Sequence, residues 1–202
     1  MRAVVPFDAA DPKTRLADVF SPAERRSFAD AMLADVLDAV QSAGADPTVL
    51  ATAPIAADAP VEVNRRPLTD AVNDVLEADD GPVAVVMADL ALATGETCRR
   101  LFDAPGDVVL AAGRGGGTNA LVARHPDFRV DYHGISYRDH LRAARRVGAS
   151  VFEFDSHRLA TDVDERGDLA ELLIHGEGAA TEWLESRGVS LAVEEGRVGV
   201  ER

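Results

Sequence analysis

The sequence predicts an α/β fold in which helices pack in layers against a central sheet. Apolar runs alternate with helical stretches from one end of the chain to the other, which is typical of this class. The chain has 202 residues, 47% of them hydrophobic, which is enough for one core of its own. No repeat, low-complexity tract or linker interrupts it. We therefore expect one domain over residues 1–202.

The first half of the chain begins with a short buried strand and then a clear helix start. Ser21 is a suitable N-cap, Pro22 suits the first helical position, and Glu24 completes a capping box. An apolar strand at 83–88 is the best candidate for the centre of the sheet. The elements expected in this half are strands at 3–6, 48–52, 61–63 and 83–88, an irregular loop at 7–20, and helices from Ser21 to Gly44 and at 69–78.

The second half continues the alternation and ends in a hairpin. Ser136 precedes a helical stretch and is expected to be its N-cap. The elements expected here are strands at 107–112, 120–123, 150–154 and 159–164, helices at 95–102, 136–147, 179–186 and from about Arg166, and a hairpin of 191–193 with 198–200 around Glu195-Gly196.

Charge and composition restrict the classes of function. With 21 basic and 35 acidic residues the net charge is −14, which argues against nucleic-acid binding. Lys13 is the single lysine, and this acidic, lysine-poor composition is typical of proteins from salt-loving organisms. No apolar run reaches the ~20 residues of a membrane span, and the N-terminus does not have the pattern of a signal peptide. We expect a cytoplasmic protein that binds no membrane.

Acidic residues are placed where metal chemistry would need them. Asp89 follows the most apolar strand, and ligands bind at the carboxyl ends of strands in parallel sheets. Asp162 and Asp164, two positions apart in a strand-like segment, would point from the same face, and Mg²⁺ would relieve their repulsion. The alternatives are a loop-capping role for Asp89 and an exposed acidic turn for the pair.

Two further segments are candidates for binding phosphate. The loop Gly113-Arg114-Gly115-Gly116-Gly117-Thr118 matches neither the dinucleotide-binding pattern nor a P-loop, because Thr118 replaces a third glycine and a strand follows. Its backbone amides and the Arg114 guanidinium could still hold an anion. Lys13 and Arg15 follow the first strand and could meet phosphates at the sheet edge. The alternatives are a flexible hairpin connection and solvated charges.

Other catalytic centres find little support in the sequence. The five histidines form no H-x-x-x-H pair and none lies beside Cys98, which argues against a zinc site. Cys98 lies in a helical stretch and is expected to be buried as a small hydrophobic residue. There is no G-x-S-x-G segment, so nucleophilic hydrolase chemistry is not indicated.

The ordered motifs of the chain resemble the 2-phospho-L-lactate guanylyltransferase family of coenzyme F-420 biosynthesis, in its halophilic archaeal form. The resemblance covers nearly the whole chain. Its most specific parts are Gly115-Gly116-Gly117-Thr118-Asn119-Ala120-Leu121 and Asp162-Val163-Asp164. It also rests on Val4-Val5-Pro6, Lys13-Thr14-Arg15-Leu16-Ala17, Ser21-Pro22-Ala23-Glu24-Arg25, Met87-Ala88-Asp89-Leu90, Ser136-Tyr137-Arg138-Asp139-His140 and Asp168-Leu169.

This resemblance implies a Rossmann-like, GT-A-like nucleotidyltransferase fold of three layers with a mostly parallel sheet. It implies that GTP and 2-phospho-L-lactate, or phosphoenolpyruvate, react to a diphospho-guanosine product and pyrophosphate. Lys13, Arg15 and Asp89 would be catalytic, and Asp89, Asp162 and Asp164 would hold Mg²⁺. The substrates would be bound by Arg114, Gly116, Gly117, Thr118, Ser136 and, at the guanine, Asp70. A homodimer is compatible with the resemblance, with the C-terminal hairpin as its edge.

Two alternatives belong to other classes. One is a different nucleotidyltransferase, of the molybdenum-cofactor or sugar-phosphate type, although those usually have a glycine-rich loop after the first strand and no glycine precedes Gly44 here. The other is a nucleotide-binding domain without catalysis, which would be favoured if the carboxylates bound no metal.

Overall fold

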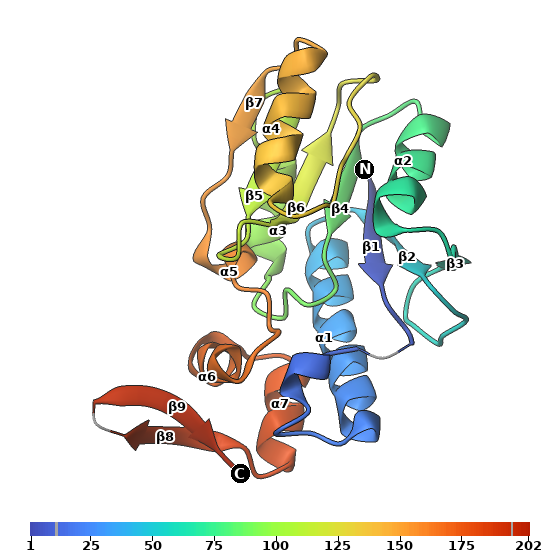
Figure 1. Ribbon diagram of the computed structural model, residues 1–202. Coiled ribbons are helices and arrows are strands. Elements are labelled where there is room, and N and C mark those ends of the chain that lie inside the picture. The colour runs from blue at the N-terminus through green and yellow to red at the C-terminus, as the bar shows by residue number, and fades with distance from the viewer. Residues whose placement is uncertain (11, 195) are drawn as a thin grey trace.

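The computed structural model has a seven-stranded sheet with helices on both of its faces (Figure 1). It describes residues 1–10, 12–194 and 196–202, so Asp11, in the predicted loop, and Glu195, in the predicted hairpin turn, lie outside the described residues. In chain order the elements are β1 (Arg2–Phe7), the 3₁₀ turn η1 (Thr14–Leu16), α1 (Pro22–Ser42), β2 (Asp46–Ala51), β3 (Val61–Val63), α2 (Leu68–Ala78), β4 (Val83–Val86), α3 (Gly95–Asp103), β5 (Val108–Ala112), β6 (Thr118–Ala123), α4 (Ser136–Arg146), β7 (Val151–Glu153), α5 (His157–Ala160), α6 (Arg166–His175), α7 (Ala179–Ser186), β8 (Ser190–Glu194) and β9 (Arg197–Glu201).

The strand order of the large sheet is β3-β2-β1-β4-β6-β5-β7. Strands β3, β2, β1 and β4 pair in parallel, and so do β5 and β7, whereas β6 is antiparallel to both of its neighbours. The mostly parallel sheet expected from the sequence is therefore confirmed, with β6 as the reversed strand.

Alternate residues of the buried strands contribute to two separate cores, one on each face of the sheet. In β4, Ala84 and Val86 pack with α1, α3, α6 and α7, whereas Val83 and Val85 pack with α2 and α4. Cys98 of α3 is fully buried in the first core, and this desolvation raises the pKa of its thiol to about 12. Its predicted role as a buried small hydrophobic residue is confirmed.

Helix α1 begins as its sequence predicts. The Ser21 amide donates to the Glu24 carboxylate at 2.9 Å, and the Ser21 hydroxyl accepts from the Glu24 amide at 3.4 Å, so both halves of the capping box are present. The helix ends at Ser42, two residues before the predicted end at Gly44. The C-terminal Arg202 forms an ion pair with Glu24, and this helps to hold the pKa of that carboxyl at about 2.

Three local predictions are wrong. Residues 159–164 form no strand: α5 ends at Ala160, and an extended loop segment follows. Ser136 is the first residue of α4 rather than its N-cap, because its hydroxyl accepts a hydrogen bond from the Thr118 amide at 3.0 Å. The loop expected at 7–20 is not irregular throughout, since it contains η1.

None of the helices in the described part of the chain combines the length and the apolar character that crossing a membrane would require.

Candidate active site

The candidate residues gather at the edge of the sheet where the parallel strands end. Asp89 follows β4, and the glycine-rich loop at residues 113–117 connects the end of β5 to the start of β6. Residues 161–165 follow β7 by way of the short helix α5. Since parallel strands end at the same edge, these segments lie where open α/β sheets bind their ligands.

The side chain of Lys13 lies at the centre of the charged residues. Its Nζ is 2.9 Å from Oδ2 of Asp89 and 3.4 Å from Oδ1 of Asp164. The Lys13 side chain is only 9% exposed, against 29% and 30% for the two aspartates. Lys13 therefore neutralises two carboxylates that come from distant parts of the chain, as buried charges require.

Lys13 has a backbone conformation that its residue type rarely adopts. Its φ of 57° lies in the left-handed region, where a side chain costs about 1 kcal/mol. The buried Arg25 side chain donates to the Pro12 carbonyl at 3.3 Å and so fixes the loop immediately before it. The strained backbone thus serves to place the ammonium group between the two aspartates.

Arg15 adds a second cation on the outer side of this cluster. Its guanidinium is 2.6 Å from Oδ2 of Asp164 and 3.6 Å from a carboxylate oxygen of Glu165. The Arg15 side chain is 65% exposed, so it can exchange these partners for a phosphate at little cost.

Asp162 is held to the sheet by Asn119 of β6. The Asn119 amide nitrogen donates to Oδ1 of Asp162 at 3.1 Å and to the Leu159 carbonyl at 2.9 Å. The Val163 amide donates to the Asp89 carbonyl at 3.1 Å, which ties the same segment to the end of β4. These bonds set the positions of Asp162 and Asp164 relative to Asp89.

Asp168, on the first turn of α6, binds the backbone just before this helix and the side chain of Arg114. Its carboxylate accepts from the amides of Asp164 at 3.0 Å and Glu165 at 2.8 Å, and it forms an ion pair with Arg114. The predicted anion ligand Arg114 is therefore already engaged by a carboxylate, although its side chain is 47% exposed.

Asp89, Asp162 and Asp164 do not converge as a closed metal site. In the part of the chain that the structure describes, these three carboxylates do not place oxygen atoms within 4.8 Å of one another. The Lys13 ammonium lies between Asp89 and Asp164 and neutralises them, as a bound metal ion would. Three carboxylates are nevertheless the hard oxygen donors that Mg²⁺ prefers, so the donor set fits this ion.

The glycine-rich loop is a hairpin connection, and most of its amides are occupied. Gly113 donates to the Gly117 carbonyl at 2.9 Å and Gly116 to the Gly113 carbonyl at 3.0 Å. Gly116 has a φ of +83°, and a Cβ on Gly113 would lie 2.3 Å from the Asn119 side chain, so both positions require glycine. In the described part of the chain no group accepts from the Gly117 amide, which stays available to an anion.

Thr118 and Ser136 lie beneath this loop in a buried network. His140 Nε2 accepts from the Asp131 amide at 2.9 Å, so the ring proton is on Nδ1 and is donated to Thr118 Oγ1 at 2.8 Å. Desolvation lowers the pKa of His140 to about 4, which keeps the ring neutral. Thr118 and Ser136 are both buried, with 3% and 5% of each residue exposed. The Thr118 amide donates to the Ser136 hydroxyl, and this bond fixes the end of the loop.

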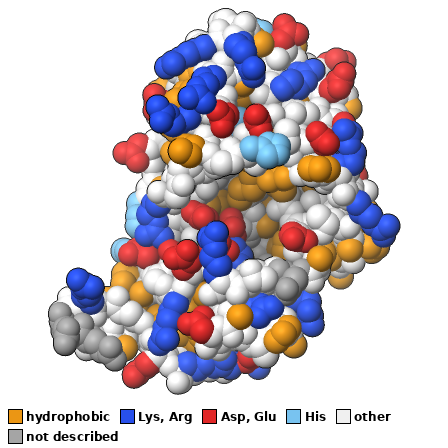
Figure 2. Space-filling model, viewed as in Figure 1, with side chains coloured by type: hydrophobic (Ala, Val, Ile, Leu, Met, Phe, Trp, Pro, Cys, Tyr) orange, Lys and Arg blue, Asp and Glu red, His pale blue; other side chains and the backbone are white. Residues whose placement is uncertain are grey.

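A hollow lies beside the charged cluster. A cavity of about 210 Å³ between the ends of β1 and β4 is lined by Pro6, Phe7, Asp8, Pro12, Lys13, Ala29, Met32, Met87, Ala88 and Asp89. Figure 2 shows a hollow across the middle of the molecule in this view. Hydrophobic side chains lie along one wall of the hollow, and acidic and basic side chains lie near its rim. Such a mixture suits a ligand with an apolar body and charged groups.

Asp70 lies apart from the cluster. It is on the first turn of α2, which follows β3 and therefore starts at the same edge of the sheet. Its carboxylate is half-exposed and lies 3.6 Å from the Arg66 guanidinium. Among the described residues, the ion pairs of Lys13 are with Asp89 and Asp164 and not with Asp70.

Sequence reasoning missed the residues that hold the site in place. Asn119, His140 and Asp168 appeared only as parts of motifs, with no role of their own. Their bonding partners lie far away along the chain, so no local spacing could have indicated them.

The fold, a mostly parallel sheet with helices on both faces, is that of solved nucleotidyltransferases. It is similar in structure to a putative nucleotide-diphospho-sugar transferase from Desulfovibrio desulfuricans, with a TM-score of 0.71 and 16% identity over 93% of this chain and 94% of that one. It is also similar to a nucleotidyl transferase from Methanothermobacter, with a TM-score of 0.58 and 17% identity over 92% and 98%. The predicted fold class is confirmed.

The chain belongs to the family described as guanylyl transferase CofC like, whose model matches residues 1–202. It is 65% identical, over the full length of both chains, to a protein from Halomicrobium mukohataei named 2-phospho-L-lactate guanylyltransferase. A protein of the same name from Haloferax volcanii is 60% identical over 98% of this chain and 97% of its own. The family predicted from the ordered motifs is confirmed.

Proposed function

We propose that this chain, acting as one domain in the cytoplasm, transfers the guanylyl group of GTP to 2-phospho-L-lactate. The products are lactyl-2-diphospho-5'-guanosine and pyrophosphate, for coenzyme F-420 biosynthesis; phosphoenolpyruvate is the alternative acceptor. The observation that carries the proposal is the Lys13 ammonium between Asp89 and Asp164 at the carboxyl edge of the sheet. The names of the relatives support it.

The reaction needs no covalent nucleophile and no general base. A phosphate oxygen of the acid, already anionic at neutral pH, attacks the α-phosphorus of GTP. The new P–O bond forms as the bond to the β-phosphate oxygen breaks, and pyrophosphate leaves with the electron pair. The protein has to align two anions and neutralise their charge, which is how most phosphoryl-transfer enzymes act.

Lys13 and Arg15 supply positive charge for the triphosphate. In this structure both are paired with Asp164, and Lys13 also with Asp89. A triphosphate offers each cation a stronger partner, and their transfer to it would leave the aspartate oxygens open. This exchange of partners by Lys13 and Arg15 would neutralise the departing pyrophosphate and free the carboxylates to bind Mg²⁺.

Asp89, Asp162 and Asp164 would hold Mg²⁺. When bound, this ion neutralises charge on the phosphates during transfer. Asn119 keeps Asp162 in place, and the bond between the Val163 amide and the Asp89 carbonyl keeps the three aspartates together.

The phosphorylated acid would lie against the glycine-rich loop, and the guanine near α2. The Gly117 amide and the Thr118 hydroxyl are the donors available to the acid, and Arg114 can join them by leaving Asp168. Gly116 and Ser136 hold the shape of the loop through their bonds to Gly113 and Thr118. Asp70 would accept hydrogen bonds from the guanine N1–H and its amino group.

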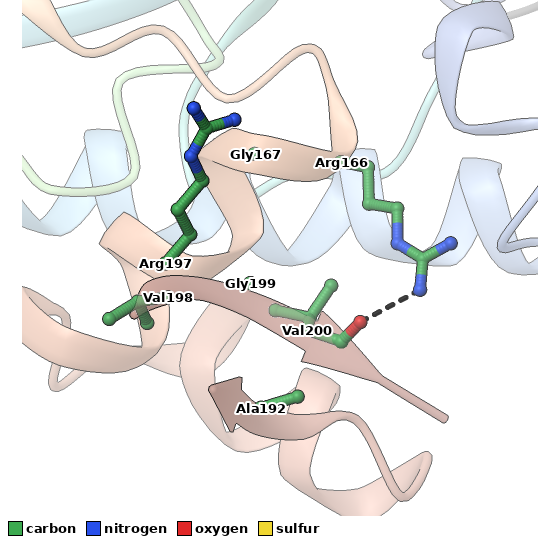
Figure 3. Close-up of a pocket in the computed structure, with 7 residues that line it drawn as sticks. All are labelled: Arg166, Gly167, Ala192, Arg197, Val198, Gly199 and Val200. Atoms are coloured by element: carbon green, nitrogen blue, oxygen red, sulfur yellow. Dashed lines mark hydrogen bonds between the residues drawn. The ribbon is translucent and has the colours of Figure 1, made fainter. Parts of the chain in front are cut away.

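We also propose a homodimer formed through the C-terminal hairpin. Val193 and Val198 are opposite each other on β8 and β9, and they are 71% and 53% exposed. A groove of about 890 Å³ runs between this hairpin and α6 (Figure 3). A two-stranded sheet is marginally stable alone, so a second copy covering these valines would stabilise it.

The test is release of pyrophosphate with Mg²⁺ in multimolar KCl, since screening of the −14 charge should favour the folded chain. GTP or ATP is combined with 2-phospho-L-lactate, phosphoenolpyruvate, a sugar phosphate or no acceptor. Release that requires GTP and one of the acids supports the proposal and identifies the acceptor. Release with a sugar phosphate instead, or none from folded protein, contradicts it.

A further inference from the structure

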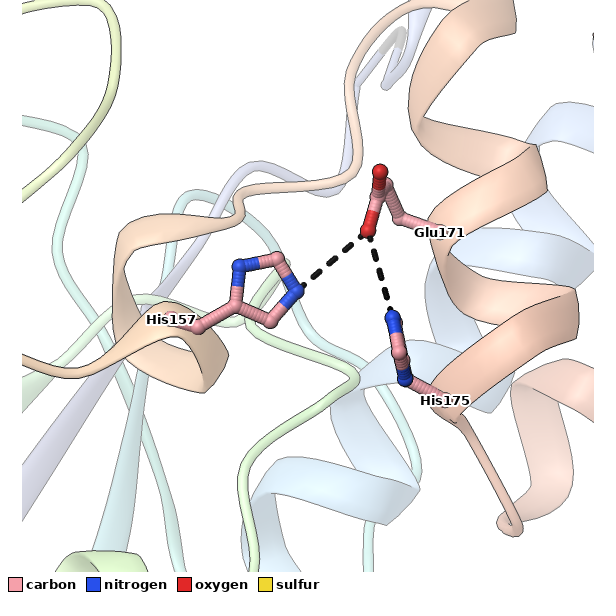
Figure 4. Close-up of side chains that lie close together, drawn as sticks. All are labelled: His157, Glu171 and His175. Carbon is pink, nitrogen blue, oxygen red and sulfur yellow. Dashed lines mark ion pairs between the residues drawn. The ribbon is translucent and has the colours of Figure 1, made fainter. Parts of the chain in front are cut away.

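Three side chains that commonly bind metals meet outside the proposed active site (Figure 4). Oε2 of Glu171 is 3.3 Å from Nε2 of His157 and 3.7 Å from Nε2 of His175, and the three atoms lie within 4.8 Å of one another. Glu171 and His175 are four residues apart on α6 and share a face of that helix, and α5 supplies His157. We propose that these three residues bind one divalent transition-metal ion, Zn²⁺ by preference.

The two separations from the carboxylate oxygen to the imidazole nitrogens suit a tetrahedral ion. Zinc bonds to nitrogen and oxygen are ~2.0–2.2 Å long, so neighbouring ligand atoms in a tetrahedral site are about 3.4 Å apart. The separations of 3.3 and 3.7 Å lie close to this edge length. Two imidazoles and one carboxylate, with water in the fourth position, are an established zinc ligand set.

Pairing among the three side chains explains the arrangement less well. A charge-assisted N–H···O bond is ~2.7–2.9 Å long, and both contacts are longer than this. The two rings are nearly perpendicular, with their centroids 5.3 Å apart, and both turn a nitrogen toward the same carboxylate oxygen. An ion at the centre would be bonded by all three.

The surroundings allow a cation to enter from solvent. The three side chains are between 32% and 53% exposed. A cavity of about 230 Å³ next to His175 is lined by Asp35, Asp38 and Glu177, against one basic residue, Arg158. Arg158 is bonded to the carbonyls of Leu92 and His175, which fixes the backbone of α6 at the site.

The two imidazoles distinguish this site from the aspartates at the sheet edge. Nitrogen ligands favour Zn²⁺ and its neighbours over Mg²⁺, whereas carboxylates alone favour Mg²⁺. The chain would thus hold two kinds of ion at separate places.

A metal here would act on the segment that carries Asp162 and Asp164. Helix α5 ends just before this segment and α6 begins just after it. An ion bound to both helices would therefore hold the two ends of the segment together and restrict its motion. This consequence for catalysis rests on the proposed function, whereas the binding of the ion does not.

The test is titration of the full chain with Zn²⁺ by calorimetry and with Co²⁺ by visible absorption, in KCl with excess Mg²⁺ to occupy the oxygen ligands. We expect one ion per chain and a tetrahedral Co²⁺ spectrum. His157→Gln, Glu171→Gln and His175→Gln should each weaken binding by more than about tenfold, since losing even an outer-shell partner costs that much. The matched controls are His133→Gln, an exposed histidine paired with Asp131, and Asp162→Asn.

The outcomes separate this site from the catalytic one. Binding that is lost in the three variants and kept in both controls supports the site, whether or not the protein releases pyrophosphate. Absence of binding, or binding that survives His157→Gln and His175→Gln in folded protein, overturns it. Binding that is lost in Asp162→Asn instead would place the ion at the sheet edge and also overturn it.

Discussion

Nζ of Lys13 lies 2.9 Å from Oδ2 of Asp89, a residue 76 positions away in the chain. The contact joins the loop after β1 to the loop after β4, and Asp164 completes it from a third segment. One cation thus neutralises two carboxylates from separate segments, and the proposed binding of GTP would replace these contacts. A strained backbone at this position accords with the proposed role of Lys13.

Replacing Lys13 separates its proposed catalytic role from its backbone strain. Lys13→Gly and Lys13→Ala both remove the ammonium, so both should lose about 100-fold or more in kcat/KM for GTP. Glycine tolerates the φ of 57° and alanine does not, so Lys13→Gly should be more stable by about 1 kcal/mol. Pyrophosphate release and urea unfolding measure the two effects. Equal stability of the two variants would show that the left-handed backbone relaxes.

The aspartates should differ in how their loss affects Mg²⁺. Among the described residues, the Asp162 carboxylate has one hydrogen-bond partner, Asn119. Asp162→Asn removes the charge that would bind Mg²⁺ and leaves Lys13 and Arg15 paired, so the required Mg²⁺ concentration should rise. Asp164→Asn also releases Lys13 and Arg15, so the KM for GTP should change as well. Activity measured across a matrix of Mg²⁺ and GTP concentrations tests this, with the exposed Asp58→Asn as control. An unaltered Mg²⁺ requirement in both variants would remove them from the metal site.

The elements of the fold could be predicted where their signals are local. The capping box of α1 and the apolar run of β4 are each complete within a few residues. The prediction of a strand at residues 159–164 is wrong although Asp162 and Asp164 have the two-residue spacing of one strand face. In the structure, Ser156 caps α5 at Leu159, and the Asp89 carbonyl binds the Val163 amide. Contacts from elsewhere in the chain decided this conformation.

The charged residues of the candidate site could be predicted from the sequence, whereas the residues that hold them in place could not. Lys13, Asp89 and Asp164 stand out by residue type and by their place after strands. The spacing of His157 and His175 in the sequence fits no metal motif. In the structure, α5 and α6 bring both side chains to Glu171. The pairing of Arg114 with Asp168, 54 residues further along the chain, likewise depends on a tertiary contact.

The hairpin valines should control assembly. Val193→Glu places a charge on the exposed β8–β9 surface and should convert the proposed dimer to a monomer in sedimentation velocity, because charges are poorly tolerated at the core of such an interface. Ile174→Glu, at an apolar side chain that is 47% exposed on α6, is the matched control and should stay dimeric. If both variants assemble like the unaltered chain, the hairpin is not the interface.

His140 should make the stability of the protein fall in mild acid. Burial lowers its pKa from 6.5 to about 4, so between these values the unfolded chain binds a proton that the folded chain refuses. The free energy of unfolding should therefore fall by up to about 3 kcal/mol as the pH drops from 6.5 to 4, with no contribution from this group above 6.5. His140→Gln lacks this term, although losing the bonds to Thr118 and Asp131 should destabilise it at neutral pH. Urea unfolding of both proteins across this range measures the difference, and the advantage of the unaltered chain should shrink with acidity. Parallel curves would mean that the folded protein accepts the proton, and that the ring is not held neutral beneath the glycine-rich loop.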